Sequence, residues 1–198
     1  MKRSAESRVG RLRKGVAEGV EAISLLSKQA DRMAQISRLM IRSLRAGGKL
    51  LMAGNGGSAA EAMHMAEELV GRFRSDRAPL PAVALAADGT ALTCIANDFG
   101  FDRVFSRQVE ALGKPGDVLV LFSTSGNSRN LLLALDAARG MQMRTVCLLG
   151  RDGGQMRGKG TIELVVGVQP TARIQEAHQL IMHLILEEIE QEFGVRQA

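Results

Sequence analysis

The sequence predicts an α/β protein with a doubly wound, mostly parallel sheet, helices on both faces and a helical extension at the N-terminus. Short apolar runs alternate with stretches of helical spacing, and no Pro/Gly/Ser-rich linker divides the 198 residues. Such alternation is typical of parallel sheets whose strands are joined by helices. We expect a single domain over residues 1–198, with 1–46 as the extension and 47–194 as the α/β core.

Apolar residues recur at helical spacing from Val16 to Leu44, which predicts one amphipathic helix or a helix pair that ends at Gly47 and Gly48. After these glycines the spacing of the apolar residues changes. Five short apolar runs bounded by Gly, Pro, Asp or Ser are typical of buried parallel strands. These runs are Lys49–Ala53, Ala82–Ala86, Asp117–Phe122, Thr145–Leu149 and Ile162–Val166. Helices are expected between and after them, over Ser58–Arg72, Val104–Leu112, Ser128–Ala138 and 172–192.

The net charge of +5 comes from the first 14 residues, which hold six basic side chains and one acid. The rest of the chain balances 20 basic against 20 acidic residues, and aromatic residues make up only 3%. Stacking platforms for nucleic acid are therefore scarce, and we do not expect a nucleic-acid partner. No apolar segment is long enough for a membrane span or a signal peptide. Cys94 and Cys147, expected as buried free thiols, fit a reducing cytoplasm.

Two of the predicted strands run into loops suited to anions. The first loop is Gly54-Asn55-Gly56-Gly57-Ser58, and the second is Ser123-Thr124-Ser125-Gly126-Asn127-Ser128. Ligands of open α/β sheets bind at the carboxyl ends of strands, where loop N–H groups and helix N-termini favour negative charge. The second loop carries four hydroxyls within six residues. This is more than helix capping requires, and it suits a phosphate monoester.

The first loop also matches the dinucleotide pattern G-x-G-x-x-A through Gly54, Gly56 and Ala59. A dinucleotide fold places an acid roughly 20 residues further on, at the end of the second strand. The nearest counterpart, Asp88, lies more than 30 residues after Gly54. Dinucleotide binding is therefore disfavoured, and the glycines serve either an anion or the turn itself.

His64 and Glu68 stand four residues apart on one predicted helix, so they lie about one turn apart on the same face. They can share a metal ion, or the imidazole can orient the carboxylate, or both can face water. On the last predicted helix, Gln175, Gln179 and His183 form a polar stripe. Gln175 and His183 are ~12 Å apart along a straight helix, so joint chelation requires a bend or ligands from different subunits.

Together these segments resemble the sugar isomerase (SIS) domain family, and within it most closely the phosphoheptose isomerases. The resemblance spans about residues 48 to 190. The matching segments are Ala53–Ala60, His64–Glu68 continuing to Arg72, Asn97–Gly100, Phe105–Gln108, Ser123–Ser128, Asp152–Gly154 and Arg173–Glu176 leading to His178 and His183.

The resemblance implies a flavodoxin-like three-layer α-β-α fold in a homotetramer, with the N-terminal extension used in oligomerisation and active sites between subunits. It implies one Zn²⁺ per subunit, held by His64, Glu68, Gln175 and His183. It also implies a sugar-phosphate substrate. The substrate-binding positions are Asn55, Gly56, Gly57, Ser58, Glu68, Asn97, Asp98, Ser123, Thr124, Ser125, Ser128 and Gln175.

The function implied is aldose–ketose isomerisation of sedoheptulose 7-phosphate to D-glycero-D-manno-heptose 7-phosphate, the first step of nucleotide-activated heptose biosynthesis. Moving a proton between C1 and C2 requires a base, for which Glu68 is the candidate, and an acid, for which His183 is the candidate. The alternative is a non-catalytic SIS-fold adaptor that binds the replication initiator DnaA; such relatives lack the acid and the histidine found here at positions 68 and 183. A third reading is an isomerase of pentose or hexose phosphates.

Overall fold

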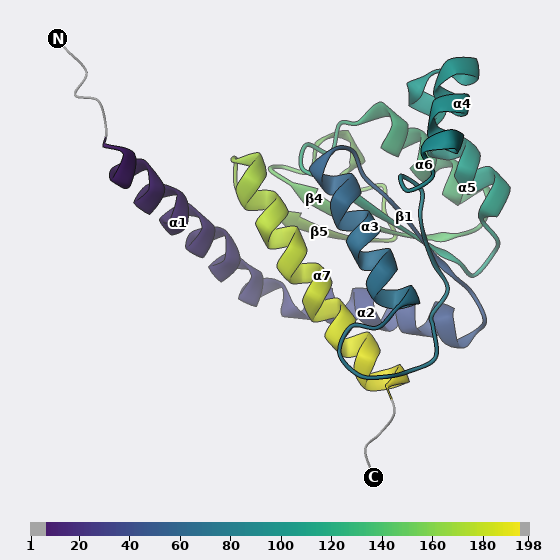
Figure 1. Cartoon of the computed structure of the whole chain (residues 1–198), viewed down its shortest axis with the longest axis horizontal. Helices are drawn as coiled ribbons and strands as arrows, with labels where there is room; N and C mark the ends of the chain where they lie inside the picture. The colour runs from purple at the N-terminus through teal and green to yellow at the C-terminus, as the bar shows by residue number, and fades with distance from the viewer. Residues whose placement is uncertain (1–6, 195–198) are drawn as a thin grey trace.

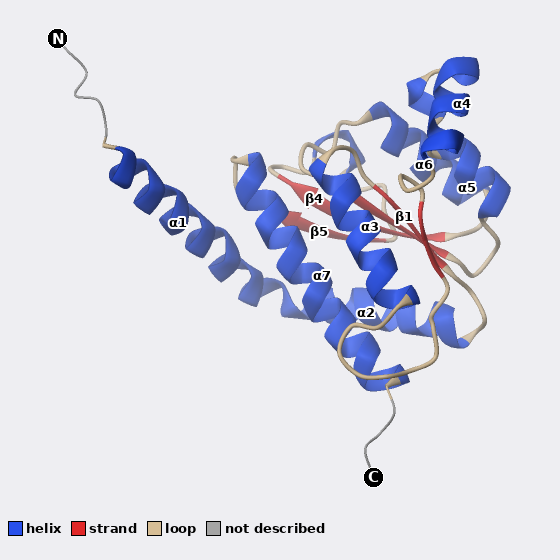
Figure 2. Ribbon diagram, viewed as in Figure 1, coloured by secondary structure: helices blue, strands red, loops and turns tan. Residues whose placement is uncertain are grey.

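The computed structural model describes residues 7–194 and contains a five-stranded sheet between two layers of helices (Figure 2). The strands lie in the order β2-β1-β3-β4-β5, and every neighbouring pair is parallel. The predicted fold class is therefore confirmed. The strands are β1 (Leu50–Ala53), β2 (Ala82–Ala84), β3 (Val118–Ser123), β4 (Arg144–Gly150) and β5 (Ile162–Val166).

The N-terminal extension is a helix pair rather than one continuous helix, which is one of the two arrangements expected from the sequence. α1 (Arg8–Ser24) and α2 (Ala30–Arg45) are separated by a 3-10 turn, η1 (Leu25–Gln29). Residues 1–6, which carry part of the basic N-terminal segment, lie outside the described residues. The remaining helices are α3 (Gly57–Val70), α4 (Gly89–Phe99), α5 (Ser106–Leu112), α6 (Arg129–Gly140) and α7 (Thr171–Phe193), with 3-10 turns η2 (Phe101–Arg103) and η3 (Gly154–Met156).

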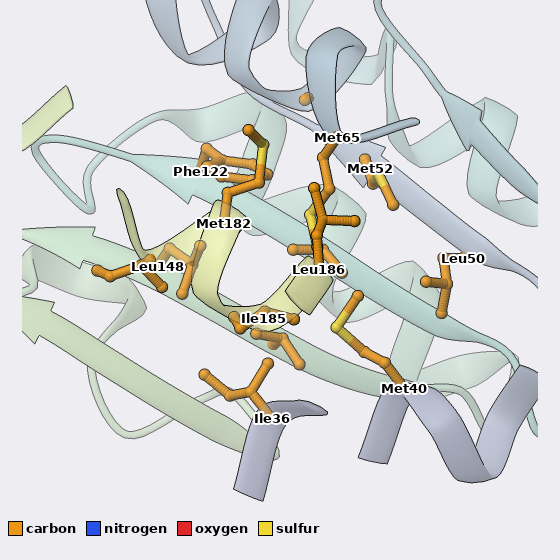
Figure 3. Packing of buried hydrophobic residues seen from close by; sticks show 14 of the residues in the cluster. Ile36, Met40, Leu50, Met52, Met65, Phe122, Leu148, Met182, Ile185 and Leu186 are labelled. Atoms are coloured by element: carbon orange, nitrogen blue, oxygen red, sulfur yellow. The ribbon is translucent and has the colours of Figure 1, made fainter. Parts of the chain in front are cut away.

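Alternate residues of the central strands build two separate hydrophobic cores. Met52, Phe122 and Leu148 face α2, α3 and α7 and pack with side chains such as Met182 (Figure 3). The residues in between, such as Leu121, pack on the opposite face against α5 and α6. Because both faces are covered, the central strands are mostly apolar rather than alternating, as expected for a parallel sheet.

The helix α1 extends away from the α/β body and contacts it along the first part of α7 (Figure 1). The Arg173 guanidinium donates to the carbonyl oxygen of Gly15 and pairs with Glu176. Large apolar side chains nevertheless remain exposed along α1: Val9, Leu12, Val16, Val20 and Ile23. None of the described helices combines the length and apolarity that a bilayer crossing requires.

The sequence-based expectations were wrong in two places. Helix α4 was not predicted, and Cys94, which it carries, is exposed rather than buried. Cys147 is buried in β4, as expected, and its pKa is raised to about 12 by burial and by the negative charge of Glu163. At pH 7 the Cys147 thiol is therefore protonated and unreactive.

The connection from α3 to β2 passes around the end of α7 (Figure 1) and is fixed there by Glu190. The backbone N–H and the hydroxyl of Ser75 both donate to Glu190 Oε1, at 2.7 and 2.6 Å. The buried Arg77 lies 3.5 Å from Glu190 Oε2 and donates to the backbone carbonyl of Glu68 at 2.7 Å. We call residues Phe73–Arg77 the strap, because they connect the end of α3 to α7.

These contacts predict how stability depends on pH. Burial raises the pKa of Glu190, but the Ser75 hydrogen bonds and the Arg77 charge outweigh it, so the pKa lies below the usual 4.5. Glu190 therefore stabilises the fold above its unfolded-state pKa, and this contribution is lost as the pH falls through the lowered folded-state pKa. We expect Glu190→Gln to lower the free energy of unfolding at pH 7 by about 1 kcal/mol or more.

Urea unfolding between pH 7 and pH 3 measures this effect. The stability difference between wild type and Glu190→Gln should shrink as the pH falls below about 4.5. Glu188→Gln is the matched control, since Glu188 is an exposed carboxylate on the same helix. A difference that stays constant over the whole pH range would contradict the assigned ionic contribution.

Candidate active site

The glycine-rich loop and the hydroxyl-rich loop meet at the carboxyl ends of two neighbouring strands. They follow β1 and β3, which are neighbours in the sheet although β2 lies between them in the chain. This is the topological switch point of the order 2-1-3-4-5, where ligands of such sheets bind. A small cavity of about 60 Å³ lies between the loops, lined by Asn55, Ser58, Phe122, Ser123, Thr124, Ser125 and Ser128.

The first loop leads directly into the N-terminus of α3. Gly56 has a φ of 56°, which a side chain would strain, and the helix begins at Gly57. A Cβ on Gly57 would lie 2.3 Å from Nε2 of Gln175, so a glycine is needed for the Gln175 side chain of α7 to approach the loop. Ser58 is buried in the first turn of α3. The N–H groups of Ser58 and Ala59 donate to the carbonyl oxygens of Asn55 and Gly56, so the positive end of the helix dipole is what favours an anion here.

The second loop is held in shape by two of its own hydroxyls. Ser123 Oγ accepts from the N–H of Gly126 at 3.0 Å, and Ser125 Oγ accepts from the N–H of Asn127 at 3.2 Å. Each hydroxyl still has its own hydrogen to donate. Gly126 has a φ of 64°, and a Cβ there would lie 1.9 Å from the carbonyl oxygen of Gly153. This packing requires glycine and fixes the loop against the segment before η3.

A pair of asparagines joins the first loop to the start of α6, the helix that follows the second loop. Asn55 Nδ2 donates to Oδ1 of Asn130 at 2.9 Å, and Asn130 Nδ2 donates back to Oδ1 of Asn55 at 2.8 Å. Asn130 is buried in the first turn of α6 and was not among the expected site residues. Leaving either amide unpaired would cost about 1–3 kcal/mol, so the pair fixes the distance between the loops.

Further along α3 and α7, three side chains form a potential metal-binding group. Single ligand atoms of His64, Glu68 and His183 all lie within 4.8 Å of one another. His64 Nε2 lies 3.2 Å from Glu68 Oε1, and the two imidazole rings meet edge to face with their centres 5.3 Å apart. The structure therefore brings together three of the four residues expected to hold zinc.

Gln179 lies among these three residues. Its Nε2 is 2.7 Å from Nδ1 of His64 and 3.0 Å from Nε2 of His183. An amide NH₂ can donate to both rings; the two lone pairs are then directed at the Gln179 nitrogen, and His64 Nε2–H can donate to Glu68. Two imidazoles and a carboxylate are donors that suit a zinc ion, so the three residues fit the metal once the Gln179 amide is displaced from between the rings.

The other expected residues are distributed differently. Gln175, the fourth expected ligand, lies one turn before Gln179 on α7, with its amide against Gly57. Asn97 and Asp98 lie on α4 and are exposed; Asn97 donates to Asp98, and Asp98 contacts Cys94. The described structure does not bring these two residues to the loops or to the His/Glu/His group.

The sheet order, the anion-type loops at the switch point and the nearby helices define the class of protein. The sequence matches the family model of the SIS domain over residues 17–150, which is more than half of the chain. The chain therefore belongs to the SIS domain family, as the resemblance implied.

Relatives narrow this assignment to the phosphoheptose isomerases. The phosphoheptose isomerase of Akkermansia muciniphila is 45% identical over 178 residues, covering 90% of this chain and 93% of the relative. That of Geobacter sulfurreducens is 50% identical over 173 residues, covering 87% and 92%. The structure of the enzyme from Neisseria gonorrhoeae is similar with a TM-score of 0.87 and 43% identity, covering 93% of this chain and all of that one. Within the SIS domain family, the chain belongs with the phosphoheptose isomerases.

Proposed function

We propose that this protein is an aldose–ketose isomerase that converts sedoheptulose 7-phosphate to D-glycero-D-manno-heptose 7-phosphate, the first step of nucleotide-activated heptose biosynthesis. The observation that carries the proposal is one site that combines an anion-type loop pair with a carboxylate and two imidazoles. The relatives named phosphoheptose isomerase cover nearly the whole chain and support the same reaction. None of the relatives described above is an adaptor that binds DnaA.

The two halves of the site suit the two ends of the substrate. The phosphate would bind between the hydroxyl loop and the first turn of α3, held by hydroxyls and backbone N–H groups. His64 lies seven residues after Gly57, or about 10 Å further along the helix axis. This separation suits a long open-chain sugar whose phosphate is remote from its reacting carbons, and it orients C1 and C2 through binding energy from the phosphate.

In the proposed reaction, Glu68 removes the proton from C1 or C2 and returns it to the other carbon through an enediol. His183 protonates and deprotonates the sugar oxygens, and it opens the ring by the same exchange. The two groups are close enough to act on adjacent atoms of one substrate. The hydrogen bond from His64 orients the Glu68 carboxylate.

His64, Glu68 and His183 would hold one Zn²⁺ per subunit, with Gln175 as the proposed fourth ligand and Gln179 as the side chain already placed among the three. Bound zinc supplies a Lewis acid that stabilises negative charge on substrate oxygens. If Glu68 also binds the metal, its carboxylate is a weaker base. Loose ligation during turnover, or a chiefly structural metal, would keep the proposed base effective.

The proposed substrate-binding set extends beyond the residues that one chain brings together. We propose a cytoplasmic homotetramer in which α4 of a second copy supplies Asn97 and Asp98 to the site. The exposed apolar side chains of α1 support the use of residues 1–46 in oligomerisation. The full set is Asn55, Gly56, Gly57, Ser58, Glu68, Asn97, Asp98, Ser123, Thr124, Ser125, Ser128 and Gln175.

Incubation of the purified protein with sedoheptulose 7-phosphate, followed by NMR, tests the function. We expect formation of an aldoheptose 7-phosphate, loss of activity with a chelator and recovery with added zinc. Folded protein that gives no product under any of these conditions would contradict the proposed reaction. Arabinose or fructose phosphates, supplied in parallel, test the pentose and hexose alternative.

Replacing Glu68 by Gln keeps the size of the side chain and removes the base. Because positioned bases contribute ~10²–10⁴-fold to a rate, we expect kcat to fall by at least about 10²-fold. Zinc content measured on the same sample separates a lost base from a lost metal. Glu188→Gln, an exposed carboxylate on α7, serves as the control and should keep wild-type turnover. A Glu68→Gln variant with more than roughly a tenth of wild-type kcat contradicts the role.

Ser125→Ala removes one hydroxyl of the second loop. If this loop holds the phosphate, the KM for sedoheptulose 7-phosphate should rise by about tenfold or more, the loss expected for one hydrogen bond to a charged group. Steady-state kinetics measure the change, and circular dichroism checks that the variant is folded. An unchanged KM would show that the Ser125 hydroxyl does not contact the substrate.

A further inference from the structure

The strap reaches the imidazole that is proposed to act as the acid. The Phe73 ring stacks on the His183 ring, with centres 5.7 Å apart and an angle of 29° between the planes. The guanidinium carbon of Arg74 lies 5.1 Å from the centre of the Phe73 ring. The same guanidinium pairs with Glu187, which follows His183 by one turn of α7. Arg74 therefore connects the phenyl ring to the helix that carries the histidine.

The remainder of the strap is fixed from two sides. Ser75 and Arg77 bind Glu190, two turns after His183, and Arg77 also donates to the backbone carbonyl of Glu68. The strap thus contacts the residue proposed as the base through its backbone and the residue proposed as the acid through its ring. These contacts hold Phe73 in a defined place relative to both helices.

The stacked Phe73 ring restricts a rotation of the His183 imidazole that a single hydrogen bond permits. The ring torsion of histidine is broad, because it joins a tetrahedral to a planar carbon. Gln179 holds one ring atom, Nε2 of His183, but the imidazole can still rotate about a line through that atom. A stacked phenyl ring selects the plane, and the plane decides where the other ring nitrogen is directed.

We propose that Phe73 is a positioning residue: it sets the plane of the His183 imidazole, and the strap holds Phe73 in place. The catalytic part of this proposal rests on the proposed isomerase function. The stacking part does not, since it concerns only two rings of the folded chain.

The stacking is tested by NMR on metal-free, full-length protein. The chain contains three histidines, so the Hε1/Cε1 region has three signals, and His183→Gln assigns one of them. We expect Phe73→Leu to move the His183 signal, because the ring current of the phenyl group is lost. Phe73→Tyr keeps the ring and should leave the signal in place. Phe193→Leu is the matched control, since Phe193 packs against the same core without an observed ring contact to a histidine.

The positioning role is tested by kinetics with sedoheptulose 7-phosphate. We expect Phe73→Leu to lower kcat by about ten- to a hundredfold, as misplacement of a reacting group does, with KM changed less than about twofold. Phe73→Tyr should restore kcat, and Phe193→Leu should keep it.

The outcomes separate the two proposals. A moved His183 signal with unchanged kcat overturns the positioning role, and so does an equal loss of kcat in Phe193→Leu. An unmoved His183 signal in folded Phe73→Leu overturns the stacking. If the wild-type protein gives no product, the proposed function fails, but the NMR result still decides whether Phe73 sets the imidazole plane.

Discussion

The packing of α3 against α7 is the constraint on which the site depends. α3 carries His64 and Glu68, and α7 carries Gln179 and His183, so the group exists only in one register of the two helices. A shift of one residue would turn the side chains of a helix by about 100° and separate the group. Both helices pack on the same hydrophobic core, and its buried side chains hold that register against the sheet (Figure 3).

Two buried polar side chains also lie where α3 meets α7. Glu61 of α3 and His178 of α7 are both buried, and His178 Nδ1 lies 3.9 Å from Glu61 Oε2. The His178 ring also meets Phe122 of β3 edge to face, with centres 6.2 Å apart. At 3.9 Å between Nδ1 and Oε2 no hydrogen bond forms, and the buried polar atoms of both side chains have no hydrogen-bond partner among the described residues. The register of α3 on α7 therefore depends on the apolar packing around this pair.

Much of the fold could be predicted because its strands are buried on both faces. Short apolar runs such as Val118–Phe122, bounded by turn residues, are typical of buried strands. β5 occupies the residues that were expected for it. Helix α4 was missed although Leu92, Ile95 and Ala96 stand at helical spacing and pack against the second core. The helix is only 11 residues long and none of its residues is fully buried, so the apolar pattern is short. A local signal was present, since the Asp88 carboxylate accepts from the N–H groups of Thr90 and Ala91 and caps the helix.

The candidate site also contains residues that the sequence could predict and residues that it could not. Spacing within one helix predicts that His64 and Glu68 are neighbours, but it says nothing about which residues of α7 meet them. The resemblance supplied His183, whereas Gln179 was noted only as part of a polar stripe. Helix geometry contained the signal. Gln179, four residues before His183, lies one turn away on the same face, whereas Gln175, eight residues before it, lies a further turn away. Asn130 gave no such signal, because its role depends on the approach of a loop 75 residues earlier.

The proposed site separates substrate binding from chemistry along one helix. The start of α3 and the hydroxyl loop are backbone-rich and rigidly turned, which suits a group that is bound but does not react. The proposed reacting groups lie two turns later, on side chains that need orientation rather than charge alone. His64 and Gln179 contribute to that orientation from within the two helices. The strap adds to it from outside, since Arg77 donates to the backbone carbonyl of Glu68 and the Phe73 ring stacks on His183. A short connection between α3 and β2 therefore contacts the backbone of one proposed reacting residue and the ring of the other, although the two residues are distant in sequence.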